Sequence, residues 1–539
     1  MEKSFDYIVI GSGFGGSVSA MRLAEKGYSV LVVEKGKEYP SKKFPKSNLN
    51  LFKYLWIPAL KMHGFQKLSF FKNASILSGV GVGGGSLVYA NTLFHPPEEF
   101  FTKNQWSKLG DWKSLLKPYY EKASFMLGRI LYNKLNTEDE LLKQTAKEFK
   151  SEDSFENVYV GVCLENKTNN GDPYFKGLGP ERNECTECGG CMVGCRENAK
   201  NTLDKNYLYF AQKFGAQILP ETLVEKISYS KGKYSLETKF STNFLFKRKT
   251  IFQSKGLIVS GGVLGTMELL LKQKYKYKTL PLLSEILGHE VRTNSETLCA
   301  VSGAKEKLNN GLAITSVFNP DSNSHVEIVK YPDRSNAMKW FFGLSVNEAS
   351  SSFKRTKQLL IKTVLHPIKV LKIIFNYKWS TNTVIFLVMQ NFNNSMKIIL
   401  KKNIWGVRLK IDNTGNRKVP AYIEVGQKVM EAYAKLSGGT TQNILLEVIL
   451  NRPTTAHILG GSPMGDDKIK GVINNKFEVY EYPNMYILDG SVIQGNPGVN
   501  PSLTITALAE YAMDQIPEQM ENKIISLDEQ LENFEDQTS

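Results

Sequence analysis

The 539-residue chain has no long hydrophobic run. Its longest apolar stretches, such as Thr383–Met389 (TVIFLVM), fall well short of the roughly 20 residues that a membrane-spanning helix needs. The N-terminus also lacks the charged segment and apolar core of a secretory signal. These absences predict a cytoplasmic protein without a spanning helix, and they leave peripheral contact with the inner face of the membrane open.

Cysteine is scarce, with six residues in the whole chain, which excludes a small disulfide-stapled scaffold. The net charge is +15, but the lysines are scattered. Because no dense basic block is interleaved with aromatic residues, nucleic acid is excluded as a partner. A chain of this length is expected to form two or more domains.

An ordered βαβ pattern opens the chain. An apolar strand at 6–10 (DYIVI) leads into GSGFGG at 11–16, and a helical pattern follows at 17–26. A second strand at 28–33 (YSVLVV) then ends in Glu34. This order of strand, glycine loop, helix, strand and acid is typical of a dinucleotide-binding unit.

Each residue type in this unit has a physical role. Gly11, Gly13 and Gly16 permit a tight turn and let a pyrophosphate approach the backbone at a helix N-terminus. Glu34 is placed to bind the ribose hydroxyls and disfavours a 2′-phosphate. The predicted ligand is therefore FAD or NAD.

Further motifs along the chain are specific in combination. They are GVGGGSLVYANTL at 81–93, SGGVLGTMELLL at 260–271, AHILGG at 456–461, LDGS at 488–491 and GVNPSLTITALAE at 498–510. With them the chain resembles the glucose–methanol–choline (GMC) oxidoreductases, and within that family the bacterial cholesterol oxidase-like branch. The resemblance runs from Asp6 to about Met513.

The resemblance implies an α/β fold, in which a Rossmann-like FAD domain of the GR2 type is joined to a substrate domain built on an antiparallel β-sheet. It implies non-covalent FAD, because the glycine loop carries no histidine and His95 lies nine residues beyond Ser86. Besides the first loop and Glu34, the cofactor residues that it implies are Gly83, Gly84, Ser86, Val224, Asp489, Asn500 and Pro501.

Oxidation of an alcohol by flavin needs a group that takes the hydroxyl proton, and histidine suits this role near neutral pH. Of the six histidines, His457 falls on the family's catalytic histidine, and Asn500 falls on its second polar partner. The helix that begins near Pro501 is expected to direct its positive end at the charge that develops on reduced flavin.

A carboxylate that shifts a steroid double bond has two candidates, Glu327 and Glu348. Alternation around Glu327 indicates a strand of the substrate sheet. The period of two does not tell whether its side chain faces the pocket or the solvent.

The FAD domain is discontinuous in this family, and we assign it residues 1–95, 200–305 and 452–520. The substrate domain takes 306–451, with an insert at 96–199 that carries the cysteines. The polar, acidic tail at 521–539 is expected to be frayed. Strand patterns at 313–318, 326–331, 383–390 and 397–401 predict the antiparallel sheet that roofs the flavin.

Two segments suit a bulky apolar alcohol better than glucose or choline. Leu51–Lys72 is rich in Leu, Phe and Trp and is a candidate for the substrate entrance. Residues 353–379 combine lysines with an apolar stripe at helical spacing. We interpret this stripe as a face packed on the protein itself, with an interfacial helix on anionic lipid as the alternative.

A cysteine run, C-x2-C-x2-C-x3-C, is formed by Cys185, Cys188, Cys191 and Cys195. Its spacing is that of bacterial ferredoxins and favours an iron–sulfur cluster, either a three-iron cluster on three of the cysteines or a four-iron one completed by Cys195 or by the distant Cys163. Reduced structural thiols, zinc and disulfides are the alternatives. Well-known cholesterol oxidases lack such a run, so the sequence leaves open whether oxygen or a carrier accepts the electrons.

The sequence thus predicts an FAD-dependent enzyme that oxidises the hydroxyl of a sterol or a similarly bulky lipid alcohol. His457 is the predicted acid/base, and Asn500 positions the hydroxyl. One alternative is an FAD/iron–sulfur dehydrogenase for another alcohol or sugar. A non-catalytic flavoprotein is the other, and the presence of His457 and Asn500 in their motifs argues against it.

Overall fold

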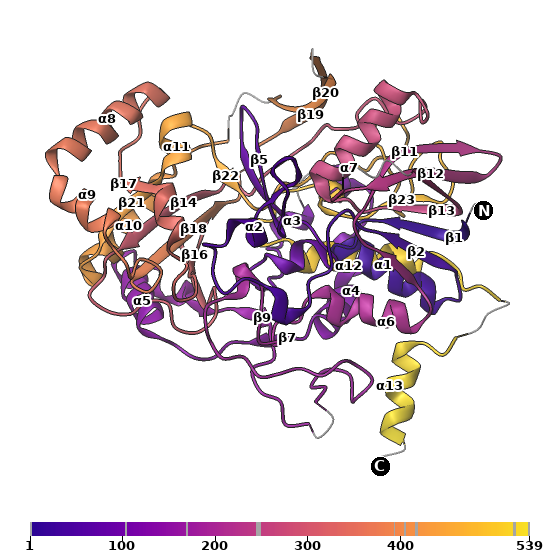
Figure 1. Ribbon diagram of the computed structural model, residues 1–539, viewed down its shortest axis with the longest axis horizontal. Helices are drawn as coiled ribbons and strands as arrows, with labels where there is room; N and C mark the ends of the chain where they lie inside the picture. The colour runs from indigo at the N-terminus through magenta and orange to yellow at the C-terminus, as the bar shows by residue number, and fades with distance from the viewer. Residues whose placement is uncertain are drawn as a thin grey trace.

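The computed structural model describes residues 3–102, 105–168, 171–243, 249–392, 394–403, 406–414, 419–520 and 524–536. These residues form two seven-stranded sheets and several small two- and three-stranded ones. Figure 1 shows the first large sheet on the right, beside the N-terminus, and the second on the left. The predicted α/β architecture with a separate antiparallel sheet is confirmed.

The first sheet has the strand order β10-β2-β1-β13-β12-β11, and β23 pairs with β13. Its parallel part consists of β10 (Gln217–Leu219), β2 (Val30–Val33), β1 (Lys3–Ile10), β13 (Thr250–Val259) and β23 (Met485–Ile487). An antiparallel extension adds β12 (Lys233–Phe240) and β11 (Thr222–Ser230). All four residues of β2, VLVV, are buried, as expected of a parallel strand covered on both faces.

The predicted βαβ unit forms as the sequence indicated. Helix α1 (Phe14–Glu25) begins within the glycine motif, directly after Gly13, and packs against α12 (Ser502–Asp514) and α6 (Tyr207–Lys213). Helix α4 (Trp112–Met126) packs in turn on α12. Gly16 permits the close contact of α1 with the loop, because a Cβ there would lie 2.0 Å from the carbonyl oxygen of Gly11.

The second sheet is antiparallel and has the order β17-β21-β14-β18-β16-β15-β8. Its strands are β17 (Phe342–Leu344), β21 (Thr440–Ile444), β14 (Thr297–Ser302), β18 (Thr383–Gln390), β16 (Ser324–Val329), β15 (Ser316–Asp321) and β8 (Glu156–Asn157). Helices α10 (Glu424–Ser437) and α5 (Thr137–Glu148) cover one face. The side chains of β18 alternate accordingly, so that Phe386 packs towards α10 and Ile385 and Leu387 point to the opposite face.

The domain borders differ from those expected from the sequence. The second sheet includes β14, which lies before residue 306, and takes β8 from the segment assigned as an insert. The predicted strand at 397–401 does form, as part of β19 (Met396–Asn403). It pairs with β20 (Gly406–Asn413) in a separate two-stranded sheet rather than joining the large one.

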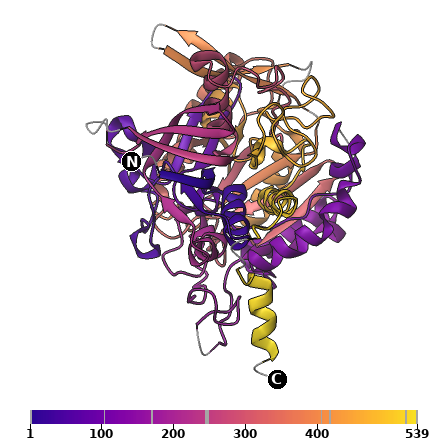
Figure 2. The ribbon, with the colours of Figure 1, turned by 90° about the vertical axis from the view of Figure 1, so that its right-hand side faces the viewer.

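The expectation of a frayed tail is wrong over residues 527–536, which form helix α13 (Leu527–Asp536). Leu527 is buried, and its N–H donates to Glu25 Oε1 at 2.6 Å. Figure 2 shows α13 extending from the body with the C-terminus at its end. Residues 521–523 and 537–539 of the predicted tail lie outside the described residues.

The stripe at 353–379 forms two helices, α8 (Ser352–Leu365) and α9 (Pro367–Ile374), separated at His366-Pro367 because a proline cannot continue the first helix. The packing interpretation is wrong for most of its apolar residues. Val364 is 77% exposed and Ile368 is 69% exposed, whereas Arg355 is the buried residue of α8. In the described part of the chain, no helix combines the length and apolar character needed to cross a bilayer.

Candidate active site

One cavity of about 990 Å³ joins the two large sheets. Its first end lies over the ends of β1 and β2, where Gly11, Gly13 and Glu34 form the wall. Its other end lies against the second sheet, where Leu298, Ile385 and Leu387 line it. The cavity thus connects a site with dinucleotide-binding features to a site that is mostly apolar.

The first end has the shape that a bound ligand requires. Gly13 has a φ of −73°, which any residue can adopt, and a Cβ there would meet no described atom within 4 Å. Gly265, inside helix α7 (Gly262–Leu271), also lines the cavity and has the same open space. Since the protein's own packing does not require glycine at either position, a ligand close to the backbone explains both.

Of the other predicted cofactor residues, Gly84, Val224, Asp489, Asn500 and Pro501 line the cavity. Gly16, Gly83 and Ser86 do not line it and instead shape the loops around it. Gly83 has a φ of +102°, which favours glycine. The Ser86 hydroxyl donates to the carbonyl of Gly83 at 2.7 Å and accepts from the N–H of Leu203 at 3.1 Å.

Two buried carboxylates stand at this end of the cavity. Glu34 accepts hydrogen bonds from the N–H and hydroxyl of Ser12 and from the N–H of Gly36. Asp489 accepts from the Thr266 hydroxyl at 2.5 Å and from the N–H of Ser491 at 2.8 Å. Burial raises the pKa of Asp489, and these hydrogen bonds oppose the shift.

Helix α12 points its N-terminus at the middle of the cavity. Asn500, Pro501 and Ser502, which lead into the helix, all line the wall. The Oδ1 atom of Asn500 is buried and has no hydrogen-bond partner among the described residues. An unsatisfied buried acceptor beside a positive helix end indicates a polar ligand at this point.

His457 is held against a carboxylate that the sequence did not indicate. Its Nδ1 lies 2.7 Å from Oε1 of Glu296, whose side chain is 1% exposed. The Thr455 hydroxyl and the N–H of Ala456 also donate to Glu296. Burial lowers the pKa of His457, but the Glu296 carboxylate outweighs burial, so the pKa lies above its ordinary value.

This pair can accept a proton at the substrate end of the cavity. Because a carboxylate can only accept, the Nδ1 of neutral His457 carries the hydrogen and its Nε2 carries the lone pair. Among the described residues that line the cavity, His457 is the one histidine. His95, by contrast, is exposed and its ring contacts Tyr120.

Glu296 was missed because nothing in its own segment marks it. It lies 161 residues before His457, in the stretch RTNSETL, which carries no glycine pattern. The two meet because the segment before β14 pairs with the segment after β22 (Thr454–Thr455), where Arg292 and Leu459 form an antiparallel bridge. No local spacing encodes such a contact.

The substrate end of the cavity is apolar and aromatic. Its lining includes Tyr54, Trp56, Val329, Tyr331, Met338 and Phe342. Tyr54 and Trp56, with Pro58, come from the 51–72 segment that the sequence indicated as the entrance. Walls of this kind suit a large apolar molecule with few polar groups.

Glu327 and Glu348, the two candidates for the carboxylate that shifts a steroid double bond, lie in different environments. Glu348 is exposed and does not line the cavity. Glu327 pairs with the cavity-lining Leu387, so both lie on the same face of the sheet. Glu327 is fully buried behind the cavity wall, with Oε1 near His325 at 3.3 Å and Oε2 without a partner among the described residues.

The described residues give no support to a metal centre at the cysteine run. Among the described residues, which include all four cysteines, no three Cys, His, Asp or Glu side chains form a group that could hold a metal ion. The iron–sulfur and zinc interpretations are therefore not supported, and the disulfide alternative is wrong because all six cysteines are free. Burial raises the pKa of Cys191 to about 11, against the charge of Lys200, so this thiol is protonated at neutral pH.

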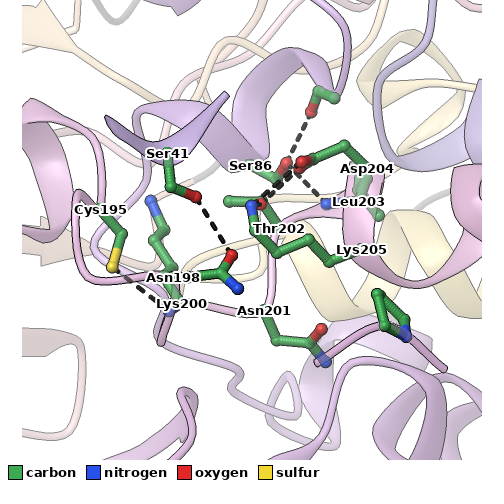
Figure 3. Close-up of polar contacts among 12 residues, drawn as sticks. Ser41, Ser86, Cys195, Asn198, Lys200, Asn201, Thr202, Leu203, Asp204 and Lys205 are labelled. Atoms are coloured by element: carbon green, nitrogen blue, oxygen red, sulfur yellow. Dashed lines mark hydrogen bonds and ion pairs between the residues drawn. The ribbon is translucent and has the colours of Figure 1, made fainter. Parts of the chain in front are cut away.

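The run instead forms part of the cavity wall. Met192, in the short 3₁₀-helix Cys191–Val193, lines the cavity. The Nζ of the buried Lys200 donates to the carbonyls of Cys191 at 2.9 Å and Tyr89 at 2.7 Å. These bonds join the cysteine segment to the second glycine-rich loop, at residues 81–93. Figure 3 shows the Sγ of Cys195 accepting from the N–H of Lys200, and Ser86 bonded to Leu203 nearby.

The fold and the cavity define a dinucleotide-binding oxidoreductase, because a parallel sheet with a glycine loop opens into a pocket that contains a histidine–carboxylate pair. Models of the GMC oxidoreductase family match residues 5–275 and 365–509. The chain belongs to the GMC oxidoreductase family, and FAD is the cofactor that the family implies.

The relatives agree with this assignment. The chain is 38% identical to a cholesterol oxidase of Acinetobacter baumannii over 95% of this chain and 94% of that protein. It is 40% identical to a cholesterol oxidase of Mycobacterium tuberculosis, over 96% and 92% of the two chains. A long-chain-alcohol oxidase of Arabidopsis thaliana is 23% identical over 96% of this chain and 68% of that protein.

A solved structure supports the fold. The pyridoxine 4-oxidase from Mesorbium loti superposes with a TM-score of 0.61 at 13% identity, covering 95% of this chain and 98% of that one. On the family models and the two cholesterol oxidase relatives, this chain is a cholesterol oxidase-like GMC flavoenzyme that oxidises an alcohol.

Proposed function

We propose that the protein oxidises the secondary hydroxyl of a sterol, or of a similarly bulky lipid alcohol, to a ketone. The observation that carries the proposal is a single cavity in which a histidine–carboxylate pair meets an apolar, aromatic end. The identity of about 40% to cholesterol oxidases, over nearly the whole of both chains, supports the same substrate class.

His457 is the proposed acid/base. Its Nε2 takes the hydroxyl proton of the substrate, and Glu296 stabilises the imidazolium that results. The raised pKa of His457 supports this role, since a stronger base accepts the proton more readily. Glu296 is a positioning residue, because it acts through His457.

Asn500 is proposed to orient the substrate hydroxyl, and its unpartnered Oδ1 supports this role. Bound FAD supplies the acceptor for the hydride that leaves the carbinol carbon. The N-terminus of α12 offsets the negative charge that develops beside it. Of the residues predicted to hold FAD, those that line the cavity are Gly11, Gly13, Glu34, Gly84, Val224, Asp489, Asn500 and Pro501.

Glu327 is proposed as the second carboxylate, which moves a proton when a steroid double bond shifts. Its place on the cavity face of the sheet and its unpartnered oxygen support this role. Molecular oxygen is the proposed electron acceptor, because two relatives that match over 92% or more of both chains are named as oxidases.

A substrate panel tests the proposal. Oxygen uptake by the FAD-loaded enzyme is measured with a detergent-dispersed 3β-hydroxysterol, a long-chain primary alcohol and pyridoxine. We expect the sterol to give the highest kcat/KM, because it fills the apolar end of the cavity. Turnover of the primary alcohol or pyridoxine with no turnover of the sterol would overturn the assignment.

A further inference from the structure

An unusually large set of apolar side chains lies exposed on α8 and α9. Phe353, Leu360, Val364, Leu365, Ile368 and Phe375 are all exposed, although Arg355 on the inner side of α8 is buried. The buried guanidinium donates to the backbone carbonyls of Ala421 and Glu447, which fixes this side of the helix to the protein. Contiguous exposed apolar surface of this kind marks an interaction site.

This surface continues to the cavity. Lys339 Nζ donates to the carbonyl of Ile374 at 2.9 Å, so the 3₁₀-helix Asn336–Phe341 packs beside α9. In that 3₁₀-helix, Trp340 is 62% exposed and Met338 lines the cavity.

The same 3₁₀-helix also contacts Asn48, directly before the 49–60 segment, whose Oδ1 accepts from the N–H of Ala337 at 3.3 Å. This segment exposes Leu49, Phe52 and Leu60, and its Tyr54 and Trp56 line the cavity. We call the exposed residues of 49–60, 340–341 and 353–377 the apolar face.

The charges within the apolar face are all of one sign. The sequence contains no Asp or Glu between residues 349 and 411, or between residues 39 and 97. Exposed lysines on α8 and α9 include Lys354, Lys357, Lys369 and Lys372, and none of them forms an ion pair within the described part of the chain. The nearest acidic residues along the chain, Asp333 and Glu348, come before α8.

We propose that the apolar face docks the enzyme on a bilayer surface that carries anionic phospholipid, and that the cavity takes its substrate from that surface. The proposal rests on the proposed function, because a sterol-sized alcohol resides in lipid. The apolar side chains enter the interface while the lysines contact the lipid phosphates. A second copy of this chain fits less well, because two such faces would bring lysines against lysines.

Vesicle co-sedimentation tests docking without any need for turnover. The FAD-loaded protein is mixed with vesicles of phosphatidylcholine alone, or of phosphatidylcholine with phosphatidylglycerol. We expect affinity for the anionic vesicles to be greater by about tenfold or more, and to fall as salt is added. Equal binding to the two kinds of vesicle, or binding to neither, would overturn the proposal.

Matched variants locate the face. The Lys369→Glu/Lys372→Glu and Ile368→Ser/Phe375→Ser variants are expected to lose binding to anionic vesicles. The control is Lys231→Glu/Lys233→Glu, which reverses two exposed lysines at the β11–β12 turn, at the opposite end of the molecule from α8 and α9 (Figure 1). Equal loss in the control would mean that net charge, rather than this face, attracts the vesicles.

Two further readouts separate docking from catalysis and from self-association. The docking variants should oxidise detergent-dispersed sterol at the wild-type rate and vesicle-borne sterol more slowly. If sterol is not a substrate, vesicle binding still reports on docking alone. A wild-type dimer that Ile368→Ser/Phe375→Ser converts to a monomer, without any change in vesicle binding, would assign the face to a second copy and overturn the proposal.

Discussion

At the scale of single residues, the account depends on the contact between Glu296 and His457. Glu296 holds Nδ1 at 2.7 Å and raises the pKa of His457 above its ordinary value. The base must be neutral to accept a proton, so kcat/KM is expected to rise with pH through this raised pKa.

The Glu296→Gln variant tests this contact. Loss of the carboxylate lowers the pKa of His457, so the rising limb of the kcat/KM profile should move to lower pH. The variant should also lose about 10²-fold in kcat, because the imidazolium is no longer stabilised. A profile unchanged in position, with only a lower rate, would mean that Glu296 does not act through His457.

Gly11 and Gly13 are glycine for different reasons. The fold itself requires glycine at position 11, whereas at position 13 only a bound ligand would require it. A Cβ at Gly13 meets only open cavity, whereas a Cβ at Gly11 would lie 2.3 Å from the carbonyl oxygen of Ser260, at a φ of +95°. We expect Gly13→Val to keep the thermal stability of the apoprotein but to lose FAD, as measured by flavin absorbance after gel filtration.

Gly11→Ala should instead destabilise the apoprotein itself by about 1–3 kcal/mol or more, through strain at a positive φ and the contact with Ser260. Calorimetry of the two apoproteins distinguishes these cases. If both variants unfold at the same temperature and both retain FAD, the loop does not hold the cofactor.

At the scale of elements, the cysteine segment shows the limit of spacing as a signal. The run matched a ferredoxin pattern, yet Met192 within it lines the cavity, and among the described residues no group of side chains that could hold a metal ion forms there. The spacing of cysteines along the chain indicates metal ligands only when the loop folds around the metal. Here Lys200 instead holds the cysteine segment against the second glycine-rich loop, at residues 81–93.

We therefore expect aerobically and anaerobically purified protein to contain substoichiometric iron and zinc by elemental analysis. The exposed Cys188 can be replaced by alanine without loss of thermal stability or change in the visible spectrum. One equivalent of either metal in the purified protein, lost on this substitution, would restore the metal-site interpretation.

Sequence periodicity was equally incomplete for α8 and α9. It identified an apolar stripe correctly, but a stripe does not specify what covers it. In the structure only Arg355 on α8 and Ile373 on α9 are buried, and most of the apolar stripe is exposed. Strand β18 was easier to predict, because all eight of its residues are buried and both of its faces are covered.

At the scale of the whole molecule, the sequence predicted what local motifs encode. The βαβ unit lies within one short stretch, His457 and Asn500 each lie in a short motif, and most strands of the antiparallel sheet have a local pattern of their own. Glu296, the inclusion of β14 in the second sheet and the link between Lys200 and the glycine loop depend on contacts between segments far apart in the chain. Only the folded structure brings those segments together.

The most direct test of the central claim is a single anaerobic mixing experiment. FAD-loaded enzyme is mixed with a 3β-hydroxysterol, and the flavin absorbance is followed before and after air is admitted, with His457→Ala as the control. The account predicts rapid bleaching that recovers in air, and bleaching slowed by about 10²–10⁴-fold in the variant. No bleaching of the wild-type flavin by the sterol, or equal bleaching in the variant, would contradict it.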